Sequence, residues 1–364
     1  MTSSPATVVR AATVLTPSGP LADGEVVVEG GTIVAVRPAT GAVSHAVLAP
    51  GFVDLQMNGT GRVDVAGADG DDWDVLDAAL LGQGVTTWCP TLVSAPIASL
   101  EASLERIGRA ARRPPALRPD IAGAHLEGPF LAVAGAHRPE DLRPSVDGAW
   151  LASLPGVAVV TLAPELPGAI DAIADLAAGG VLVALGHSAC RIEVARRAAG
   201  AGAGLVTHLG NAMGPFGQRE PGLLGAALTD DRLAVSLIAD LVHVHPALLT
   251  MAFRAKGPGR TVLVTDAVAT GDGPVGGGPP RMADGTLVGS VLTMDRAVAN
   301  TVGEADVALA DAVAAASATP AALLGLPDRG VIAPGRRADL VGLGPDLGVE
   351  GVWVAGERAW PVPT

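Results

Sequence analysis

The feature that most constrains the fold is a regular alternation of apolar runs and Ala- and Leu-rich stretches in the middle of the chain. Eight runs have the character of strands: 51–57, 85–91, 121–126, 157–163, 181–186, 205–208, 234–239 and 261–265. Helical stretches lie between most of them, at 73–81, 97–112, 169–178, 191–199 and 247–254, and a last helix is expected at 305–318. Alternation of this kind indicates a parallel sheet, and eight units over this length favour a (β/α)8 TIM-like barrel over an open doubly wound sheet.

The two ends of the chain differ from this middle part. Short strand-like runs occur at 7–15, 25–29 and 32–36, and again at 338–343, 351–354 and 358–360. Gly-containing turns separate them, and helical periodicity is absent. Because chain termini often lie close together, we expect the ends to pair. The sequence therefore predicts a small β-sandwich domain from residues 1–49 and 330–364, and a catalytic barrel from residues 50–329.

Charge and composition limit the partners and the compartment. The net charge of −13 and the pI of about 4.9 argue against nucleic acid and anionic membranes as partners. No apolar run reaches the ~18–20 residues of a membrane span, and residues 1–10 do not resemble a signal peptide. Two cysteines give no disulfide framework, and Cys89 is expected to be a small buried side chain. We expect a cytoplasmic protein.

Polar side chains gather where the apolar runs end, which is where barrel enzymes build their sites. They are Gln56 and Asn58, His125 and Glu127, His187, His208, Asp240 and His243, and Asp266. A single histidine at the end of an apolar run is more often structural. Four of the seven histidines in such places, together with carboxylates, favour a functional site.

One carboxylate and two histidines form a common catalytic zinc set that leaves a position for water. Glu127, His187 and His208 supply this set. A bound divalent metal lowers the pKa of its water to about 7. Asp266 then suits a general base that returns the proton to a leaving amine, or else a further ligand. His243 suits a donor to the substrate carbonyl or a hydroxyl, or else a partner of a ligand.

At these residues the chain resembles the amidohydrolase superfamily, and within it the N-acetylglucosamine-6-phosphate deacetylases. The matching segments run through nearly the whole chain, and the most specific are Thr207-His-Leu-Gly-Asn-Ala-Met213 and Arg219-Glu-Pro-Gly222. Others are Ala49-Pro-Gly-Phe-Val-Asp54, His125-Leu-Glu-Gly-Pro-Phe130, Gly135-Ala-His137, Gly186-His-Ser188, Val264-Thr-Asp-Ala267 and Gly289-Ser-Val-Leu-Thr-Met294.

The resemblance implies an amidohydrolase-type barrel that converts N-acetylglucosamine 6-phosphate to glucosamine 6-phosphate and acetate, in amino-sugar catabolism and cell-wall recycling. It implies the metal ligands and the acid/base residue named above. It makes His243 a substrate-binding residue, with backbone N–H groups of Asn211 and Ala212. Arg219 would meet the phosphate, for which an arginine is well suited. His137 matches a histidine that reaches the phosphate of a neighbouring subunit, which implies a homodimer.

Two positions depart from the family pattern. Many amidohydrolases carry His-x-His after the first strand, whereas this chain has Gln56 and Asn58. Amides are poor ligands for zinc-like ions, so we expect one metal per subunit and at most a weak second site near Gln56, Asn58 and His125. His125 shares the strand face of Glu127, which favours a supporting role. Gly210 replaces an aromatic residue, which would loosen substrate choice.

Several alternatives stay open. Zinc fits the ligand set, but Fe2+, Co2+, Mn2+ or Cd2+ would fit the same residues. The substrate could be another N-acyl amino sugar such as N-acetylgalactosamine 6-phosphate. A non-catalytic scaffold on the same fold is a remote alternative, because such proteins usually lose metal ligands. The loops 132–143 and 271–289 are candidate lids over the site.

Overall fold

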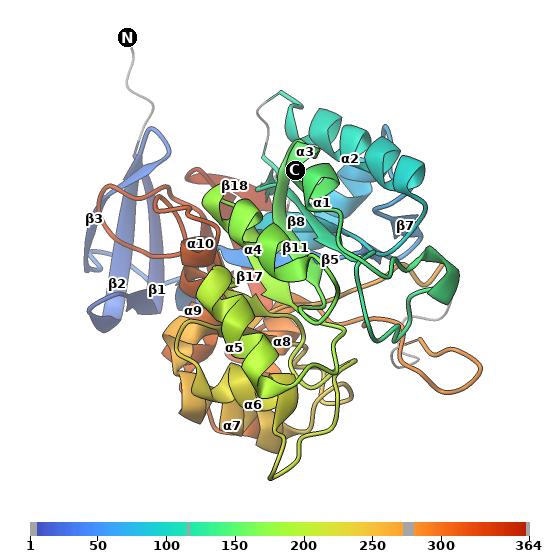
Figure 1. The fold of residues 1–364 in the computed structure, drawn as a ribbon. Helices are drawn as coiled ribbons and strands as arrows, with labels where there is room; N and C mark the ends of the chain where they lie inside the picture. Colours follow the sequence, from blue (N-terminus) through green and yellow to red (C-terminus); the bar gives the residue numbers. More distant parts are fainter. Residues whose placement is uncertain (1–5, 115–116, 272–279, 362–364) are drawn as a thin grey trace.

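The computed structural model describes residues 6–114, 117–271 and 280–361. Its centre is a parallel sheet that curls into a nearly closed eight-stranded barrel (Figure 1). In spatial order the strands are β5 (Phe52–Met57), β8 (Val85–Leu92), β10 (Ala124–Glu127), β11 (Val157–Leu162), β12 (Leu182–Leu185), β13 (Leu205–Val206), β14 (Ala234–Leu237) and β15 (Thr261–Leu263). The predicted barrel and its eight strands are confirmed.

The barrel closes between its first and last strands through a few backbone contacts. The N–H of Asp266 donates to the carbonyl of Gln56 (2.8 Å), and Met57 forms an isolated bridge with Ala267. The short strand β9 (Asp120–Ile121) pairs with β8 off the main path. Every residue of β5, β8, β10 and β14 is buried, as expected for parallel strands covered on both faces.

Helices cover the outside of the barrel. They are α1 (Asp72–Gly82), α2 (Ile97–Ala111), α3 (Gly148–Ser153), α4 (Ala169–Ala178), α5 (Ile192–Ala201), α6 (Gly222–Thr229), α7 (Pro246–Lys256), α8 (Met294–Ala305), α9 (Leu309–Ala316) and α10 (Ala318–Leu323), with short 3-10 helices at Pro139–Asp141 and Pro258–Arg260. None of these helices combines the length and the apolar character that crossing a membrane would need.

The prediction of one helix over 305–318 is wrong at both ends. Ala305 ends α8, because Asp306 takes a left-handed conformation (φ 54°) and breaks the helix. A second break at Ser317 separates α9 from α10. The helices α3, α6 and α8 were not predicted at all. The first two are short, and the Asn, Thr and Gly content of α8 weakens its helical signal.

Both ends of the chain join in one seven-stranded sheet, at the left of Figure 1 and behind the helices. Its order is β18 (Glu357–Trp360), β17 (Val349–Val354), β16 (Leu340–Leu343), β4 (His45–Pro50), β1 (Thr7–Thr16), β2 (Gly19–Glu29) and β3 (Thr32–Pro38). The expected β-domain from both termini is therefore present as this sheet. Strand β4 joins the two ends, since it pairs with β1 on one side and β16 on the other. The boundaries at residues 49 and 330 stay a prediction.

Candidate metal centre and substrate cavity

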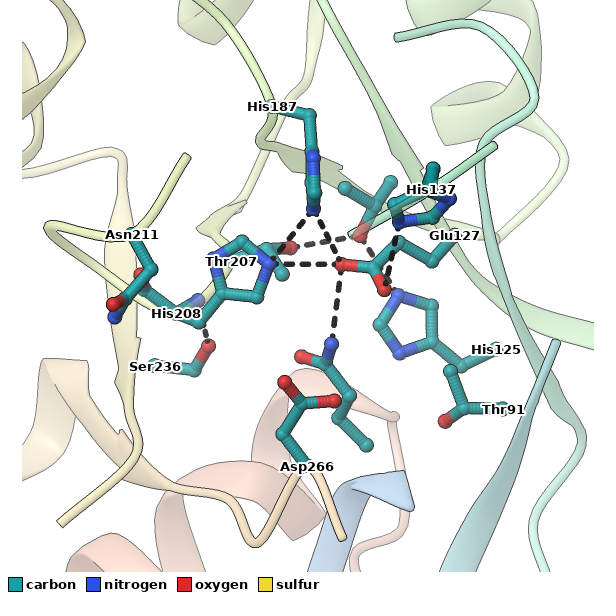
Figure 2. A network of polar contacts seen from close by, with 12 residues as sticks. Thr91, His125, Glu127, His137, His187, Thr207, His208, Asn211, Ser236 and Asp266 are labelled. Atoms are coloured by element: carbon teal, nitrogen blue, oxygen red, sulfur yellow. Dashed lines mark hydrogen bonds and ion pairs between the residues drawn. The ribbon is translucent and has the colours of Figure 1, made fainter. Parts of the chain in front are cut away.

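The residues predicted to act together meet at the carboxyl ends of the barrel strands. Glu127 is the last residue of β10, while His187 and His208 lie two residues beyond β12 and β13. Asp266 lies three residues beyond β15, on the other side of the rim. Figure 2 shows the side chains of these residues turned toward one another.

Three of these residues have a backbone conformation that side-chain-bearing residues seldom adopt. The φ angles are 49° at His187, 33° at His208 and 47° at Asp266. Such left-handed residues cost free energy and persist only where the surroundings hold them. The N–H of His208 donates to Ser236 Oγ (2.8 Å), for example. These turns end the strands one or two residues earlier than the apolar runs predicted.

The donor atoms of Glu127, His187 and His208 converge on one point. His208 Nε2 lies 2.9 Å from Glu127 Oε1 and 3.1 Å from His187 Nε2 (Figure 2). His187 Nε2 lies 3.4 Å from the same carboxylate oxygen. Neighbouring ligands of a tetrahedral ion with bonds of about 2.0–2.1 Å lie about 3.3 Å apart. The three side chains are 3–4% exposed, so the point is shielded from solvent.

The protonation of His187 tests whether a cation fits there. Its Nδ1 lies 2.8 Å from the carbonyl oxygen of Val133, which only accepts, so Nδ1 carries the hydrogen. The lone pair of its Nε2 therefore faces the second imidazole and the carboxylate. The Nδ1 atom of His208 has no hydrogen-bond partner among the described residues. Acceptor atoms gathered in this way fit a divalent cation.

His137 also lies at this cluster, and its place corrects the sequence-based expectation. Its Nε2 is 3.6 Å from Glu127 Oε2, and Glu127, His137 and His187 together could hold an ion. The N–H of Ser94 donates to Nδ1 of His137 (3.2 Å), so its Nε2 carries the hydrogen and is a donor rather than a ligand. The ring is 6% exposed and belongs to this chain's own cavity, so it is not placed to reach a neighbouring subunit.

The two amides at the end of β5, Gln56 and Asn58, act as hydrogen-bond donors. Gln56 Nε2 donates to Glu127 Oε1 (3.1 Å), and Asn58 Nδ2 donates to Asp266 Oδ1 (2.8 Å). Each amide thus orients a carboxylate by its N–H group. The expectation of a single metal stays a prediction.

The pKa values of the two carboxylates of the site are shifted in opposite directions. Burial works to raise the pKa of Glu127, but the neighbouring rings of His137, His187 and His208 outweigh it and hold the pKa well below its ordinary value. Burial, and next the negative charge of Glu127, raise the pKa of Asp266 to about 6. One carboxylate is therefore suited to hold a cation, and the other to exchange a proton near neutral pH.

His125 supports the site through contacts with neighbouring strands. Its Nδ1 lies 2.9 Å from the carbonyl oxygen of Leu55, and its Nε2 lies 2.7 Å from Thr161 Oγ1, which contacts Thr207 Oγ1 at 2.7 Å (Figure 2). Burial, above all, lowers the pKa of His125 to about 4. The ring is therefore neutral and does not line the cavity. Cys89 is fully buried, and burial raises the pKa of its thiol, which agrees with a purely packing role.

A cavity of about 570 Å³ opens above the cluster. Asn211, Ala212, His243 and Asp266, which the sequence predicts as substrate-binding or catalytic residues, line it together with His137. The sequence did not single out Asp64, Val93, Thr286, Leu287 or Val288, which also line it. The last three precede the quoted Gly289 motif in the loop predicted as a lid, of which residues 272–279 lie outside the described residues. Gly135 and Ala136 of loop 132–143 form part of the wall.

Two predicted residues lie outside the cavity. Arg219 is exposed and lines a separate hollow with Cys190 and Gly214. Gly210 has a φ of 91°, and a Cβ there would point at Leu248 of α7, 3.0 Å from its Cδ2. The expectation that Gly210 removes bulk beside the sugar is therefore wrong. Among the described lining residues there is no lysine or arginine.

Comparisons with known proteins show the family of this chain. The Amidohydrolase family model matches residues 47–359. An N-acetylgalactosamine-6-phosphate deacetylase of Escherichia coli O157:H7 is 37% identical over 97% of this chain and 99% of its own length. An N-acetylglucosamine-6-phosphate deacetylase of Bos taurus is 38% identical over 87% of this chain and 84% of its own length.

A solved structure of a relative has the same fold. It is an N-acetyl-D-glucosamine-6-phosphate deacetylase of Mycobacterium smegmatis, an aspartate-to-alanine mutant in complex with N-acetyl-D-glucosamine-6-phosphate. It superposes with a TM-score of 0.90 at 33% identity, over 98% of this chain and all of that one. Likeness of this kind to enzymes sets the non-catalytic alternative aside.

Proposed function

Because this chain belongs to the amidohydrolase family, as one of its N-acetylhexosamine-6-phosphate deacetylases, we propose that its substrate is N-acetyl-D-glucosamine 6-phosphate, which it hydrolyses to D-glucosamine 6-phosphate and acetate. The observation that carries the proposal is the convergence of Glu127, His187 and His208 beside Asp266, at the floor of a cavity large enough for a phosphosugar. One relative is named for the galactosamine compound and another, of similar identity, for the glucosamine compound, so experiment must decide the sugar.

The proposed chemistry uses the difference between the two buried carboxylates. A divalent ion held by Glu127, His187 and His208 would polarise the amide carbonyl and lower the pKa of water. Asp266 accepts a proton from the attacking water as its oxygen bonds to the carbonyl carbon. The same carboxyl then gives that proton to the amide nitrogen as the C–N bond breaks, which releases acetate and the free amine. Asn58 keeps Asp266 oriented throughout by its hydrogen bond.

The substrate contacts follow from the lining of the cavity. We propose that His243 and the N–H of His137 meet polar groups of the sugar or of the acetamide. Backbone N–H groups of Asn211 and Ala212 would serve the phosphate or a hydroxyl, since amide N–H groups bind anions well. Zinc is the ion we propose, at one per subunit, because a carboxylate and two imidazoles suit it.

The phosphate needs a cation that the described lining does not supply. Arg219 is exposed and lies outside its own chain's cavity. We therefore propose a homodimer in which a second copy brings Arg219 to the phosphate, a role that the buried His137 cannot take. An arginine and a phosphate form a strong bidentate contact.

The test of the proposed function is acetate release from a panel of sugars, with metal analysis of the same sample. The panel contains N-acetylglucosamine and N-acetylgalactosamine, each with and without a 6-phosphate. We expect the highest kcat/KM for N-acetylglucosamine 6-phosphate and about one bound metal per chain. A higher value for the galactosamine compound would establish the alternative. Absence of turnover with all four sugars in metal-loaded protein would refute the assignment.

Mixing two impaired variants tests whether Arg219 acts across subunits. Arg219→Ala retains Asp266, and Asp266→Asn retains Arg219, so a mixed dimer holds one site with both residues. We expect activity to return when the two variants are unfolded and refolded together. Separately refolded variants that are then assayed side by side are the control. Failure of any mixed refolding to restore activity, despite proven mixed dimers, would rule out the shared site.

A further inference from the structure

The turn after β14 carries a carboxylate whose role no motif explains. Asp240 and His243 follow the strand closely, and His243 lines the cavity whereas Asp240 does not. Between them Leu241 adopts a left-handed φ of 66°, which is uncommon for a residue with a branched side chain. Backbone strain of this kind needs compensating contacts to persist.

Asp240 supplies those contacts with both of its oxygens. Oδ1 accepts hydrogen bonds from the N–H groups of Val242 (2.9 Å) and His243 (2.8 Å). Oδ2 lies 2.7 Å from Nδ1 of the His243 ring. Both side chains are largely buried, at 10% and 5% exposed. From below, Asn300 Nδ2 donates to the carbonyl of Ala239 (2.9 Å), which anchors the start of the turn.

These contacts determine which nitrogen of His243 carries hydrogen. Burial works to raise the pKa of Asp240, but the His243 ring and the two backbone N–H groups outweigh it and hold the pKa below its ordinary value. An ionised carboxylate only accepts hydrogen bonds. When the ring carries a single hydrogen, that hydrogen is therefore on Nδ1, and Nε2 is left to the substrate side. Rotating the ring would break the 2.7 Å contact.

We propose that Asp240 is a positioning residue that fixes both the ring orientation and the tautomer of His243, so that Nε2 is available to the substrate. This inference rests on the proposed function, in which His243 contacts the substrate. The orientation of His243 matters because the described lining of the cavity contains no lysine or arginine. Histidines and carboxylates are therefore its ionisable side chains. Asp240 itself touches no substrate.

Asp240→Asn gives a specific test, because the backbone fixes how the amide is oriented. The two N–H groups of Val242 and His243 require an acceptor, so the amide oxygen must take the place of Oδ1. The amide NH2 then faces the ring and donates to Nδ1. The neutral ring is forced into the opposite tautomer, with its hydrogen on Nε2. Replacing the buried partner of a histidine in this way is expected to cost about 10- to 100-fold in kcat/KM.

A matched control is Asp346→Asn. Asp346 also accepts a hydrogen bond from a backbone N–H two residues on, that of Gly348 (3.1 Å), but it is exposed in the loop between β16 and β17 and has no histidine partner. We expect this variant to retain wild-type kcat/KM. Thermal unfolding of both variants, followed by circular dichroism, separates a change in the site from a change in folding.

The tautomer can be read directly by long-range 1H–15N NMR of the histidine rings in metal-loaded protein, with the His243 signals assigned by their loss in His243→Gln. We expect the Nδ1–H form in the wild type and the Nε2–H form in Asp240→Asn. A wild-type His243 with its hydrogen on Nε2 would overturn the inference without any variant, and without touching the proposed function.

A double-mutant cycle supplies the kinetic test. If Asp240 acts through His243, Asp240→Asn should change kcat/KM by less than about twofold in the His243→Gln background, since coupled residues are not additive. A full 10- to 100-fold loss in that background would mean that Asp240 only maintains the turn, and would overturn the proposal. Wild-type acetate release stays as the separate measure of the proposed function.

Discussion

The two ends of the substrate cavity are built very differently. The floor, around Glu127, His187, His208 and Asp266, is buried and hydrogen-bonded within one chain. The rest of the lining, here called the mouth, comes from residues outside the barrel strands, such as Asp64, Val93 and Leu287. The described lining contains no lysine or arginine, although these relatives are named as deacetylases of phosphorylated sugars.

The difference shows which part of the structure serves bond breaking and which part serves recognition of the substrate. The bond-breaking groups are held by strand ends and strained turns that one folded chain maintains. In the proposed function, recognition of the phosphate depends on a charge from outside this cavity, and the exposed Arg219 is our candidate for it. Changes at the floor should therefore affect every substrate, and changes at the mouth should affect only phosphorylated ones. The following predictions test this contrast from the largest effect to the smallest.

Removal of the metal should have the largest effect. We expect a chelator to lower kcat for every sugar by at least about a thousandfold, because Lewis-acid stabilisation is worth several kcal/mol and each 1.4 kcal/mol is tenfold in rate. Added Zn2+ should restore turnover. It should also raise the unfolding temperature, since an ion that binds only the folded state stabilises it. Chelated protein that keeps its full rate would contradict the metal centre.

Asp266→Asn should lower kcat by about 10²–10⁴-fold for all substrates while metal content stays at the wild-type level. In the wild type, kcat/KM should fall as the pH drops through the pKa of Asp266, because only the ionised carboxylate accepts the proton from water. That pKa is raised to about 6 by burial and by Glu127, and a bound cation would lower it. A pH–rate profile and metal analysis check both points. An active Asp266→Asn enzyme would exclude the mechanism.

Arg219→Ala should act only at the mouth. We expect kcat/KM to fall about 10- to 100-fold for phosphorylated sugars, the size expected for one lost charge-assisted contact, with no change for unphosphorylated ones. Arg191→Ala is the matched control, because Arg191 is also exposed and is paired with Glu220. An equal loss with both classes of sugar would assign Arg219 to folding or assembly instead.

Asp54 lies among the residues that hold the floor of the cavity in place. It is fully buried, accepts hydrogen bonds from Thr265 Oγ1 (2.6 Å) and the N–H of Gln56 (3.1 Å), and so ties β5 to the segment that carries Asp266. Burial, above all, raises its pKa to about 7. A raised pKa means that the folded state binds the proton more tightly than the unfolded state does. The contribution of Asp54 to the free energy of unfolding is therefore fully present below about pH 4 and is lost as the pH rises to 7.

Asp54→Asn should remove that pH dependence. We expect the wild-type free energy of unfolding to change between pH 4 and 7 by about 2–4 kcal/mol more than that of the variant, since one pKa unit corresponds to about 1.4 kcal/mol. Urea unfolding at several pH values measures it. Parallel pH curves for the two proteins would show that Asp54 is ionised in the native protein throughout this range.

Gly210→Ala should have the smallest effect on catalysis. Its φ of 91° and the 3.0 Å approach to Leu248 make an added Cβ unfavourable by about 1–2 kcal/mol of stability. Because that Cβ faces α7, the ratio of kcat/KM for the two N-acetylhexosamine phosphates should change by less than about twofold. A large change in this ratio would restore the position to the sugar pocket.

The periodicity of the sequence predicted the barrel because each strand and most helices are encoded locally. Apolar runs such as 157–163 needed no distant information, and the polar residues at their ends were gathered by topology alone. Residues such as Ser94 and Leu287 were missed because they lie in loops without periodicity. Helix α8 (Met294–Ala305) was missed because packing, rather than propensity, stabilises it.

The sequence by itself determined which polar residues stand at the ends of the barrel strands. Among them is the set Glu127, His187, His208 and Asp266. Only the tertiary structure decided that His137 turns into its own chain's cluster, that Gly210 faces α7, and that Arg219 stays outside the cavity. The physical reason is range. A strand alternates its side chains by local geometry, whereas the direction of a loop side chain depends on whichever distant backbone groups are there to hold it.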